Sequence, residues 1–464
     1  MSSSWSRQLF NRLKSPARRV IPLAWRRRLN DRLRGVSVRG QLAAEPDLAY
    51  TNQLDVFVFA GAGRDASGGC RPAPEMAWQV RGIHTFYPGD PPFAGLLAAG
   101  DTPRTVAGCE QAAGWLETFA HTQAVEEAVC VVQHPVWHGV VAALKQRYGW
   151  KVVVDSLTVD RATGGTDQLP APEPDGQPLS SLADLVIREG PVFVDGELQG
   201  AAWQDIRNLY ERVSIIIVSY NGLEFTRQCV ESILGRTIYP NYDIIVVDNG
   251  SKTDVEEYLR GLAAGQDRVQ VVLNGANRGF AAANNIGLQR AAGSQFVVLL
   301  NNDTVVPRGW LCRLLRHARK PQVGLVGPVT NWTGNEARIE VSYRDVRDVE
   351  AFARAHTYAN EGKAFDIGVL AMYCVAMRKA VADQVGPLDE RYEVGMFEDD
   401  DYARRVRQAG YRVICAEDVF VHHYGMASFA RLGEAEYRAI FERNKERYEQ
   451  KWGGPWQPYR ARDR

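Results

Sequence analysis

Residues 244–251, IIVVDNGS, decide the fold. The first four form a continuous β-branched run, which is typical of a strand covered on both faces within a parallel sheet. A second apolar strand ends at Asn301, Asn302 and Asp303. Ligands of open α/β sheets bind beyond the carboxyl ends of the strands. The two strand ends therefore predict a site for a nucleotide and a metal ion, to which Asp248 and Asp303 each bring a carboxylate.

Strand and helix patterns alternate around this stretch. Residues 213–218 (VSIIIV), 269–273 and 295–300 are further predicted strands, and residues 223–234 carry the apolar stripe of a helix. The order β-α-β-α-β-α-β predicts an α/β fold with a Rossmann-like, mostly parallel sheet flanked by helices.

Composition limits the classes of protein that fit. A chain of 464 residues is long enough for two or three domains. The 55 basic and 55 acidic residues cancel, so no nucleic acid partner is expected. Seven scattered cysteines without a C-x-x-C pair argue against a disulfide framework and a zinc site, and favour a cytoplasmic setting. Without an apolar run of about eighteen residues, the chain is predicted neither to span a membrane nor to be secreted.

The first 48 residues form a predicted tail of distinct character. Residues 1–40 hold eleven Lys or Arg and a single acid, Asp31, and their apolar residues recur at i, i+4 spacing. Short basic amphipathic helices of this kind favour peripheral contact with an anionic membrane, here the cytoplasmic face of the inner membrane. A solvated, partly disordered tail remains the alternative.

Residues 49–205 predict a second, smaller Rossmann-like α/β domain. Apolar runs at 55–60, 128–133 and 150–154 read as strands, with a helix at 140–148 that implies a parallel crossover. His134, Pro135, Trp137 and Asp155 resemble a pattern in the N-terminal half of family 4 glycosyltransferases of the GT-B type. Because the second half of that fold is absent, we expect a degenerate, non-catalytic segment used for packing or acceptor handling.

Five further motifs occur in a fixed order. They are Ser219-Tyr220-Asn221, 247–251 (VDNGS), 277–281 (NRGFA) with Asn284-Asn285, 300–303 (LNND) and 397–401 (FEDDD). Their order and spacing resemble family 2 glycosyltransferases with the GT-A fold, especially rhamnosyltransferase-like bacterial members, over residues 211–430 or so. We predict that the GT-A domain extends over residues 211–452 and is followed by a C-terminal tail at 453–464.

The first motifs provide the predicted donor site. The residues assigned to it are Ser219, Tyr220, Asn221, Asp248, Asn249, Arg278, Gly279, Asn285 and Asn302. Asp248 stands where a strand opens into a glycine-containing turn, so its carboxylate can accept a hydrogen bond from a pyrimidine N–H; capping of the next helix is the alternative. Arg278 neutralises phosphate charge or is simply solvated. Gly279 keeps the loop thin, and the following helix is expected to begin near Ala282.

Asp303 and His423 are the predicted metal ligands. Asp303 suits a hard divalent cation, Mn²⁺ or Mg²⁺, that bridges the diphosphate oxygens. Asn301 replaces the first carboxylate of the Asp-x-Asp motif usual in the family. His423 follows from the resemblance, because the histidine five residues before a serine fills this role in similar enzymes.

Glu398 and Asp399 are the predicted catalytic acids. We expect both on a loop before a helix at 402–409, where crowded carboxylates raise each other's pKa and one acts as general base. The resemblance gives the base to Asp399. For the acceptor, Trp332 is predicted to stack on a sugar ring, and Met372 lies in a segment that resembles the one shaping the acceptor pocket.

The predicted function is inverting transfer of a hexosyl or deoxyhexosyl group from a UDP- or dTDP-sugar to a hydroxyl of a glycan or lipid-linked acceptor, in bacterial surface polysaccharide synthesis. A nucleotidyltransferase is the alternative among enzymes, although residues 219–222 lack its Gly-rich basic loop. A non-catalytic scaffold that binds sugar nucleotides is the alternative outside enzymes.

Overall fold

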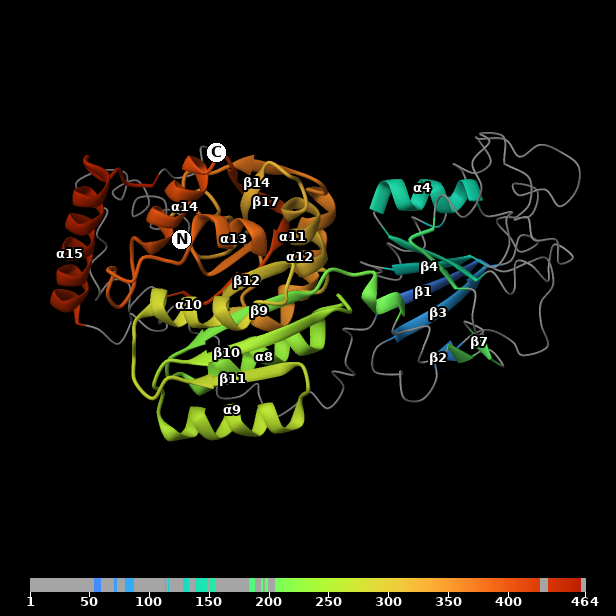
Figure 1. Ribbon diagram of the computed structural model, residues 1–464, viewed down its shortest axis with the longest axis horizontal. Coiled ribbons are helices and arrows are strands. Elements are labelled where there is room, and N and C mark those ends of the chain that lie inside the picture. The colour runs from blue at the N-terminus through green and yellow to red at the C-terminus, as the bar shows by residue number, and fades with distance from the viewer. Residues whose placement is uncertain are drawn as a thin grey trace, which may run out of the picture.

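The computed structural model describes residues 205–425 and 433–459 without a break, together with shorter stretches of the N-terminal part (Figure 1). These stretches are residues 54–59, 71–72, 80–86, 113, 116, 128–132, 138–148, 150–155, 183–187, 193–194 and 197–198. The predicted basic tail at 1–48 and the residues His134, Pro135 and Trp137 lie outside the described residues. Within the described part of the chain, no helix is long and apolar enough to cross a membrane.

An eight-stranded sheet forms the centre of the C-terminal part. Its strands are β9 (Val213–Ser219), β10 (Tyr242–Asp248), β11 (Val269–Leu273), β12 (Phe296–Asn301), β14 (Val323–Val329), β15 (Ala364–Asp366), β16 (Cys374–Arg378) and β17 (Arg412–Phe420). They lie in the order β11-β10-β9-β12-β16-β14-β17-β15. β11, β10, β9 and β12 are mutually parallel, β16 is antiparallel to both of its neighbours, and β17 is parallel to β14.

The predicted α/β fold with a mostly parallel, helix-flanked sheet is confirmed. Strands predicted at 213–218, 269–273 and 295–300 appear within a residue of their expected bounds. The antiparallel β16 was not predicted as part of the sheet, because its apolar run gives no sign of strand direction.

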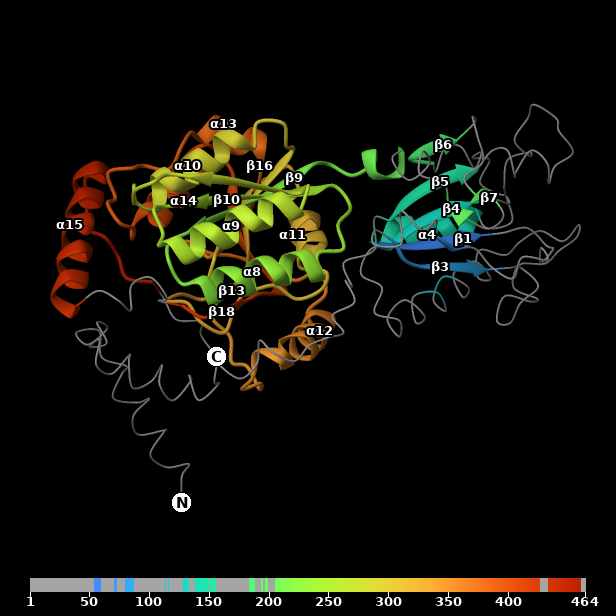
Figure 2. The same cartoon turned by 90° about the horizontal axis from the view of Figure 1, so that it is seen from below.

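Helices cover both faces of this sheet (Figures 1 and 2). They are α8 (Leu223–Arg236), α9 (Thr253–Gly265), α10 (Phe280–Arg290), α11 (Trp310–Ala318), α12 (Val349–Ala359), α13 (Lys379–Val385) and α14 (Glu398–Gln408), with a short 3₁₀ turn, η5, at Val346–Asp348. The last helix, α15 (Glu434–Trp452), stands at one side of the domain. The loop at residues 274–279, called the donor loop below, leads into α10. This helix begins at Phe280, two residues before the expected start.

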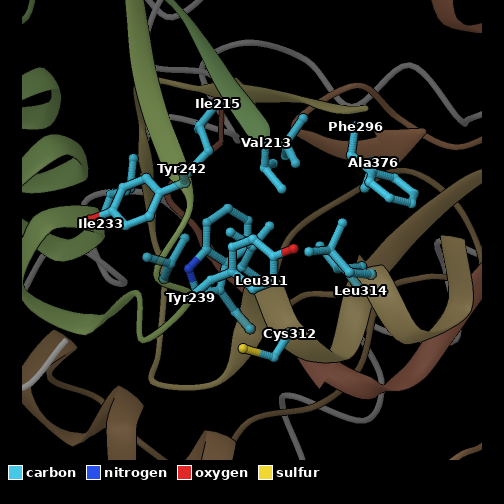
Figure 3. Close-up of a cluster of buried hydrophobic side chains, with 14 of the residues drawn as sticks. Val213, Ile215, Ile233, Tyr239, Tyr242, Phe296, Leu311, Cys312, Leu314 and Ala376 are labelled. Atoms are coloured by element: carbon cyan, nitrogen blue, oxygen red, sulfur yellow. The ribbon is translucent and has the colours of Figure 1, made fainter. Parts of the chain in front are cut away.

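Alternate side chains of β9 enter two separate hydrophobic cores. Ile215 and Ile217 pack in one core with residues of α8, α9 and α11, whereas Ile216 packs on the other face with residues of α10, α12, α13 and α14. Figure 3 shows part of the first core, with Ile215 of β9, Ile233 of α8 and Leu311 of α11 among its buried side chains. Each fully buried aliphatic side chain contributes about 1.5–3 kcal/mol. The core therefore fixes the strands whose ends carry the polar motifs.

A two-stranded ribbon crosses beside the large sheet. β13 (Thr304–Val305) directly follows Asp303 and pairs antiparallel with β18 (His422–His423), so that His423 lies opposite Thr304. This pairing brings together two parts of the chain that are more than a hundred residues apart.

A second sheet lies in the N-terminal part. It has five parallel strands in the order β3 (Val80–Phe86), β1 (Leu54–Phe59), β4 (Ala128–Val132), β5 (Lys151–Asp155) and β6 (Leu185–Ile187), with α4 (His138–Tyr148) between β4 and β5. Three short strands, β2 (Arg71–Pro72), β7 (Phe193–Val194) and β8 (Glu197–Leu198), form a small third sheet. The predicted parallel strand–helix–strand crossover is confirmed, while the domain boundaries and the GT-B resemblance stay predictions.

Candidate active site

Asp248 and Asp303 leave the same edge of the large sheet. Asp248 ends β10 and pairs with Ser219 at the end of β9, and Asn301 at the end of β12 pairs with Val218 of β9. The two acids are therefore separated by the single strand β9, and both face the carboxyl end where ligands of parallel sheets bind.

The Asp248 carboxylate closes the turn that follows β10. Its Oδ2 atom accepts hydrogen bonds from the backbone N–H groups of Gly250 (3.2 Å) and Ser251 (3.0 Å). Helix α9 begins only at Thr253, and Lys252 is its N-cap, so the alternative in which Asp248 caps this helix is wrong. The other oxygen, Oδ1, is buried and has no hydrogen-bond partner among the described residues. A buried acceptor of this kind is costly unless a ligand donor reaches it.

Gly250 brings this turn against the next loop. Its φ of +78° is a backbone conformation that residues with a side chain rarely adopt, and a Cβ there would lie 2.7 Å from the backbone of Ala276. The turn and the loop containing Arg278 are thus held in direct contact.

Asn249 holds the donor loop in place. Its Nδ2 donates to Asn277 Oδ1 (2.9 Å) and to the Gly279 carbonyl (3.2 Å), while its Oδ1 accepts from Asn274 Nδ2 (3.1 Å) and the Arg278 N–H (3.0 Å). The side chain of Asn249 thus acts on the loop, and the Arg278 residue that it positions is exposed.

Three buried polar side chains connect the carboxyl ends of β9 and β12. Ser219 Oγ and Thr226 Oγ1 lie 3.1 Å apart, and Asn302 Nδ2 donates to Thr226 Oγ1 at 2.8 Å. Tyr220, next along the chain, is 37% exposed, and Asn221 follows in a left-handed conformation with φ of 56°. An exposed aromatic ring at the strand end is available to stack on a planar group.

Asn285 anchors a distant loop. Its Oδ1 accepts from the Leu388 N–H (2.8 Å), and its Nδ2 donates to the Leu388 carbonyl (2.9 Å) and to Glu390 Oε1 (2.8 Å). Its polar atoms are therefore engaged with residues 388–390, which lead toward the acidic cluster.

His423 meets Asp303 across the β13–β18 ribbon. Its Nε2 atom lies 3.2 Å from Asp303 Oδ1, and its Nδ1 donates to the Trp332 carbonyl at 2.9 Å. The Tyr373 ring stacks on the imidazole at a centroid distance of 4.9 Å. Burial lowers the pKa of His423, but the Asp303 carboxylate and the Trp332 carbonyl outweigh it, so the net pKa is raised.

The Asp303–His423 pair fits a divalent cation. Because Nδ1 is held by a carbonyl, Nε2 is the nitrogen that faces the carboxylate, which is the usual orientation of a metal-binding histidine. Among the described residues there is no group of three or more His, Cys, Asp or Glu side chains able to hold a metal on their own. A hard cation such as Mg²⁺ typically takes one or two protein ligands and completes its shell with water and substrate phosphate.

The acidic cluster begins a helix. α14 starts at Glu398 with Phe397 as its N-cap, so the expectation that Glu398 and Asp399 lie on a loop before the helix is wrong. The positive end of the helix dipole favours acids in the first turn, which explains the earlier start. Glu398, Asp400 and Asp401 are buried, whereas Asp399 is half-buried.

The crowded carboxylates of this cluster have high proton affinity. Burial, with a further contribution from Asp400, raises the pKa of Glu398 to about 7. Burial and the charges of Asp400 and Glu398 raise the pKa of Asp399 well above its ordinary value. A carboxylate with a raised pKa is a stronger general base when it is deprotonated.

The loop that precedes the acidic cluster lies beside the donor loop. A Cβ built on Gly279 would lie 3.5 Å from the backbone nitrogen of Val394, four residues before Glu398. This close approach of the two loops places the Asp248 side of the site next to the loop that leads to Asp399.

Residues 214–386, a little over a third of the chain, match the profile described as "Glycosyl transferase family 2". The chain carries a family 2 glycosyltransferase domain. The predicted resemblance to family 2 glycosyltransferases is confirmed for these residues.

Several proteins resemble this chain over the same region. "Uncharacterized protein y4gI" of Sinorhizobium fredii is 30% identical over 52% of this chain and 27% of its own length. "Glycosyltransferase AglE" of Haloferax volcanii is 27% identical over 46% and 66%, and "O-antigen biosynthesis protein RfbC" of Myxococcus xanthus is 28% identical over 49% and 18%. The chain thus spans between 18% and 66% of the length of these relatives.

Solved structures also match the chain. One is "Mannosyltransferase PcManGT from Pyrobaculum calidifontis in complex with GDP-Man and Mn2+", with 20% identity and a TM-score of 0.40 over 54% of this chain and 66% of that one. Another is "Crystal structure of GalNAc-T7 with UDP, GalNAc and Mn2+", with 18% identity and a TM-score of 0.38 over 47% and 43%.

The two predicted acceptor residues of the glycosyltransferase domain differ in exposure. Met372 is 5% exposed and packs within the second core, so its side chain faces the interior. Trp332 is half-buried beside His423, and a Cβ on Gly425 would overlap its indole ring. Trp332 is therefore the better placed of the two to meet a sugar.

Sequence reasoning missed two residues that shape the glycosyltransferase site. Thr226 carries the Ser219–Asn302 link, and Tyr373 stacks on His423. Thr226 lies within the apolar stripe of α8, which gave a local signal, whereas Tyr373 shows no local pattern because its partner is distant in sequence. Asn331, predicted beside Trp332 on the acceptor side, instead exchanges two hydrogen bonds with the His423 backbone, at 2.9 and 3.1 Å.

Proposed function

We propose that this glycosyltransferase domain moves a sugar from a nucleotide-sugar donor to a hydroxyl of a glycan or lipid-linked acceptor, with inversion at the anomeric carbon. One observation carries the proposal: the unpaired Oδ1 of Asp248 and the Asp303–His423 pair lie at the same sheet edge, one strand apart. A nucleotide diphosphate has a base N–H for the first and a charged diphosphate for the second.

The donor's base and ribose are assigned to the Asp248 side. Asp248 Oδ1 accepts the N–H of a pyrimidine ring, which favours a UDP- or dTDP-sugar, and the exposed ring of Tyr220 stacks on the base. The loop held by Asn249 carries Arg278 and leads into the N-terminus of α10, where backbone N–H groups favour phosphate.

The diphosphate is assigned to Asp303 and His423. These residues would hold Mn²⁺ or Mg²⁺, which when bound supplies positive charge for the departing diphosphate. The Trp332 carbonyl and the Tyr373 ring fix the imidazole so that Nε2 stays directed at Asp303.

Asp399 acts as general base in this proposal. It removes the proton from the incoming hydroxyl, while burial, together with the charges of Asp400 and Glu398, keeps its pKa raised. A single displacement by that hydroxyl inverts the anomeric centre.

The relatives support a role in polysaccharide synthesis. One of them is named an O-antigen biosynthesis protein and another a glycosyltransferase. Within the proposal, the transferred group is a hexosyl or deoxyhexosyl unit, and the chain works in the bacterial cytoplasm, with residues 1–40 in peripheral contact with the inner membrane.

A thermal-shift panel of nucleotide sugars, with and without Mn²⁺, tests the proposal. We expect UDP- or dTDP-sugars with Mn²⁺ to raise the unfolding midpoint by several degrees, because a ligand at about 100 times its Kd adds about 2.7 kcal/mol of stability. Purine nucleotide sugars should have less effect. In Asp248→Asn, the preference for pyrimidines should weaken.

Asp267→Asn is the matched control, because Asp267 is exposed beyond the end of α9. It should respond as the wild type does. If no nucleotide sugar shifts the midpoint under any condition, donor binding at this edge is wrong.

A further inference from the structure

The acidic cluster is preceded by a loop with an unfavourable backbone. Val394, Gly395, Met396 and Phe397 all have positive φ values, of 68°, 145°, 81° and 74°. A β-branched residue such as Val394 rarely adopts this conformation, so the surrounding structure must maintain it. The loop directly precedes Glu398 and therefore sets the direction in which α14 begins.

Helix α15 contacts this loop through a fully buried asparagine. Asn444 is 0% exposed, and its Nδ2 donates to the carbonyls of Gly395 (2.9 Å) and Glu393 (3.1 Å), with the Met396 carbonyl at 3.4 Å. Phe397 packs among aromatic rings of the same C-terminal segment, including Tyr448 and Trp456. Figures 1 and 2 show α15 standing at the side of the domain where α14 lies.

The residues after α15 reach the acids themselves. Trp456 Nε1 donates to Asp400 Oδ1 at 2.9 Å, and the Tyr459 hydroxyl donates to Asp400 Oδ2. Trp452 Nε1 donates to Asp401 Oδ1 at 3.0 Å. Both oxygens of the buried Asp400 are thus satisfied from the C-terminal segment, and the Asp400 N–H in turn donates to Asp399 Oδ1 at 3.0 Å.

Tyr459 also lies against the metal side of the site. A Cβ built on Gly334 would be 3.8 Å from Tyr459 Cδ2, and Gly334 belongs to the loop whose Trp332 carbonyl accepts from His423. Tyr459 therefore bonds to the acidic cluster and also lies beside the loop that orients the imidazole.

We propose that Tyr459 and Trp456 are positioning residues for the Asp399 base, and that residues 434–459 are an integral part of the active site. The proposal rests on the proposed function, because it concerns how Asp399 is aimed at the acceptor hydroxyl. Tyr459 and Trp456 fix Asp400, Asn444 fixes the strained loop, and together they set the first turn of α14 on which Asp399 stands.

The test compares kcat and donor KM in the full-length chain with Tyr459→Phe and Trp456→Phe. We expect each variant to lose about tenfold or more in kcat, since small misplacements of reacting groups are costly. The donor KM should stay within about twofold, because neither residue is assigned to the donor. Tyr411→Phe is the matched control: it removes a tyrosine hydroxyl bond to Gln384 away from the acids and should leave kcat unchanged.

Hydrogen exchange of the amides at 394–401 gives a readout that does not need activity. Exchange should accelerate in Tyr459→Phe and Trp456→Phe and stay unchanged in Tyr411→Phe. Should the wild type transfer no sugar, the proposed function fails, while faster exchange would still support the positioning of this turn. If folded Tyr459→Phe and Trp456→Phe proteins keep both wild-type kcat and wild-type exchange, the segment only covers the domain and the proposal is overturned.

Discussion

Asp399→Asn should lower kcat for sugar transfer about 10³-fold, because general-base catalysis typically contributes 10²–10⁴-fold. Asparagine preserves the size of the side chain and its place in the first turn of α14 but cannot accept the proton. Since Asp399 is not assigned to the donor, the affinity for a nucleotide diphosphate with Mn²⁺ should change little. Steady-state transfer kinetics and calorimetric donor titration measure the two quantities separately.

The pH profile of kcat checks the same assignment. Burial and neighbouring charges raise the pKa values of Asp399 and Glu398, the latter to about 7. The base works when deprotonated, so activity should fall as the pH drops through this raised value, well above the ordinary carboxyl pKa of about 4. Coupled carboxylates titrate as a group, so the fall in activity at low pH reports the titration of the whole acidic cluster and not of Asp399 alone.

Asp383→Asn is the control for the Asp399 variant. Asp383 is an exposed carboxylate paired with Lys379 on α13, and its loss should leave both kcat and the pH dependence of kcat unchanged. Near-wild-type turnover in Asp399→Asn would assign the base to another group, and the buried Glu398, whose Oε2 has no partner within the described chain, would be the first to examine.

Asp303→Asn should lower kcat/KM about 100-fold or more and abolish the response to Mn²⁺. Loss of groups that merely support a metal ligand already costs 10–100-fold, and Asp303 is assigned as a ligand itself. The buried position of Asp303 accepts the isosteric amide, and the backbone bond from the Tyr424 N–H to the Asp303 carbonyl is unaffected. Turnover measured across a Mn²⁺ titration gives the result.

Asp345→Asn provides a comparison for this variant. Asp345 caps the 3₁₀ turn η5 and pairs with Arg347, and it is not assigned to the donor or the cation. Its Mn²⁺ dependence should match the wild type. An Asp303→Asn protein that still needs Mn²⁺ at the wild-type concentration would remove Asp303 from the cation site.

Local sequence patterns were sufficient to predict the strands and the sheet edge that Asp248 and Asp303 share. Residues 215–218 and 244–247 are apolar without alternation, which is the pattern of strands buried on both faces, and the polar residues after them had to emerge at one edge. The identity of His423 followed from a family resemblance, and the β13–β18 pairing supplies the physical reason for its position beside Asp303.

The supporting contacts could not be predicted in the same way. The sequence predicts Asn249 as a donor ligand, yet in the structure its side chain holds the loop around Arg278 in place. Residues 453–464 were predicted to form a C-terminal tail, yet Trp456 and Tyr459 bond to Asp400. Such contacts depend on residues brought together by the whole fold, which single-sequence patterns do not contain.

Pulsed electron paramagnetic resonance of bound Mn²⁺ tests the central claim most directly. With wild-type protein and a pyrimidine nucleotide diphosphate, we expect ³¹P couplings from the diphosphate together with a ¹⁴N coupling from His423 Nε2. His423→Gln should lose the ¹⁴N coupling and keep the ³¹P couplings. A wild-type spectrum without ¹⁴N coupling, or one that His423→Gln leaves unchanged, would contradict a donor diphosphate held at this sheet edge by a cation on Asp303 and His423.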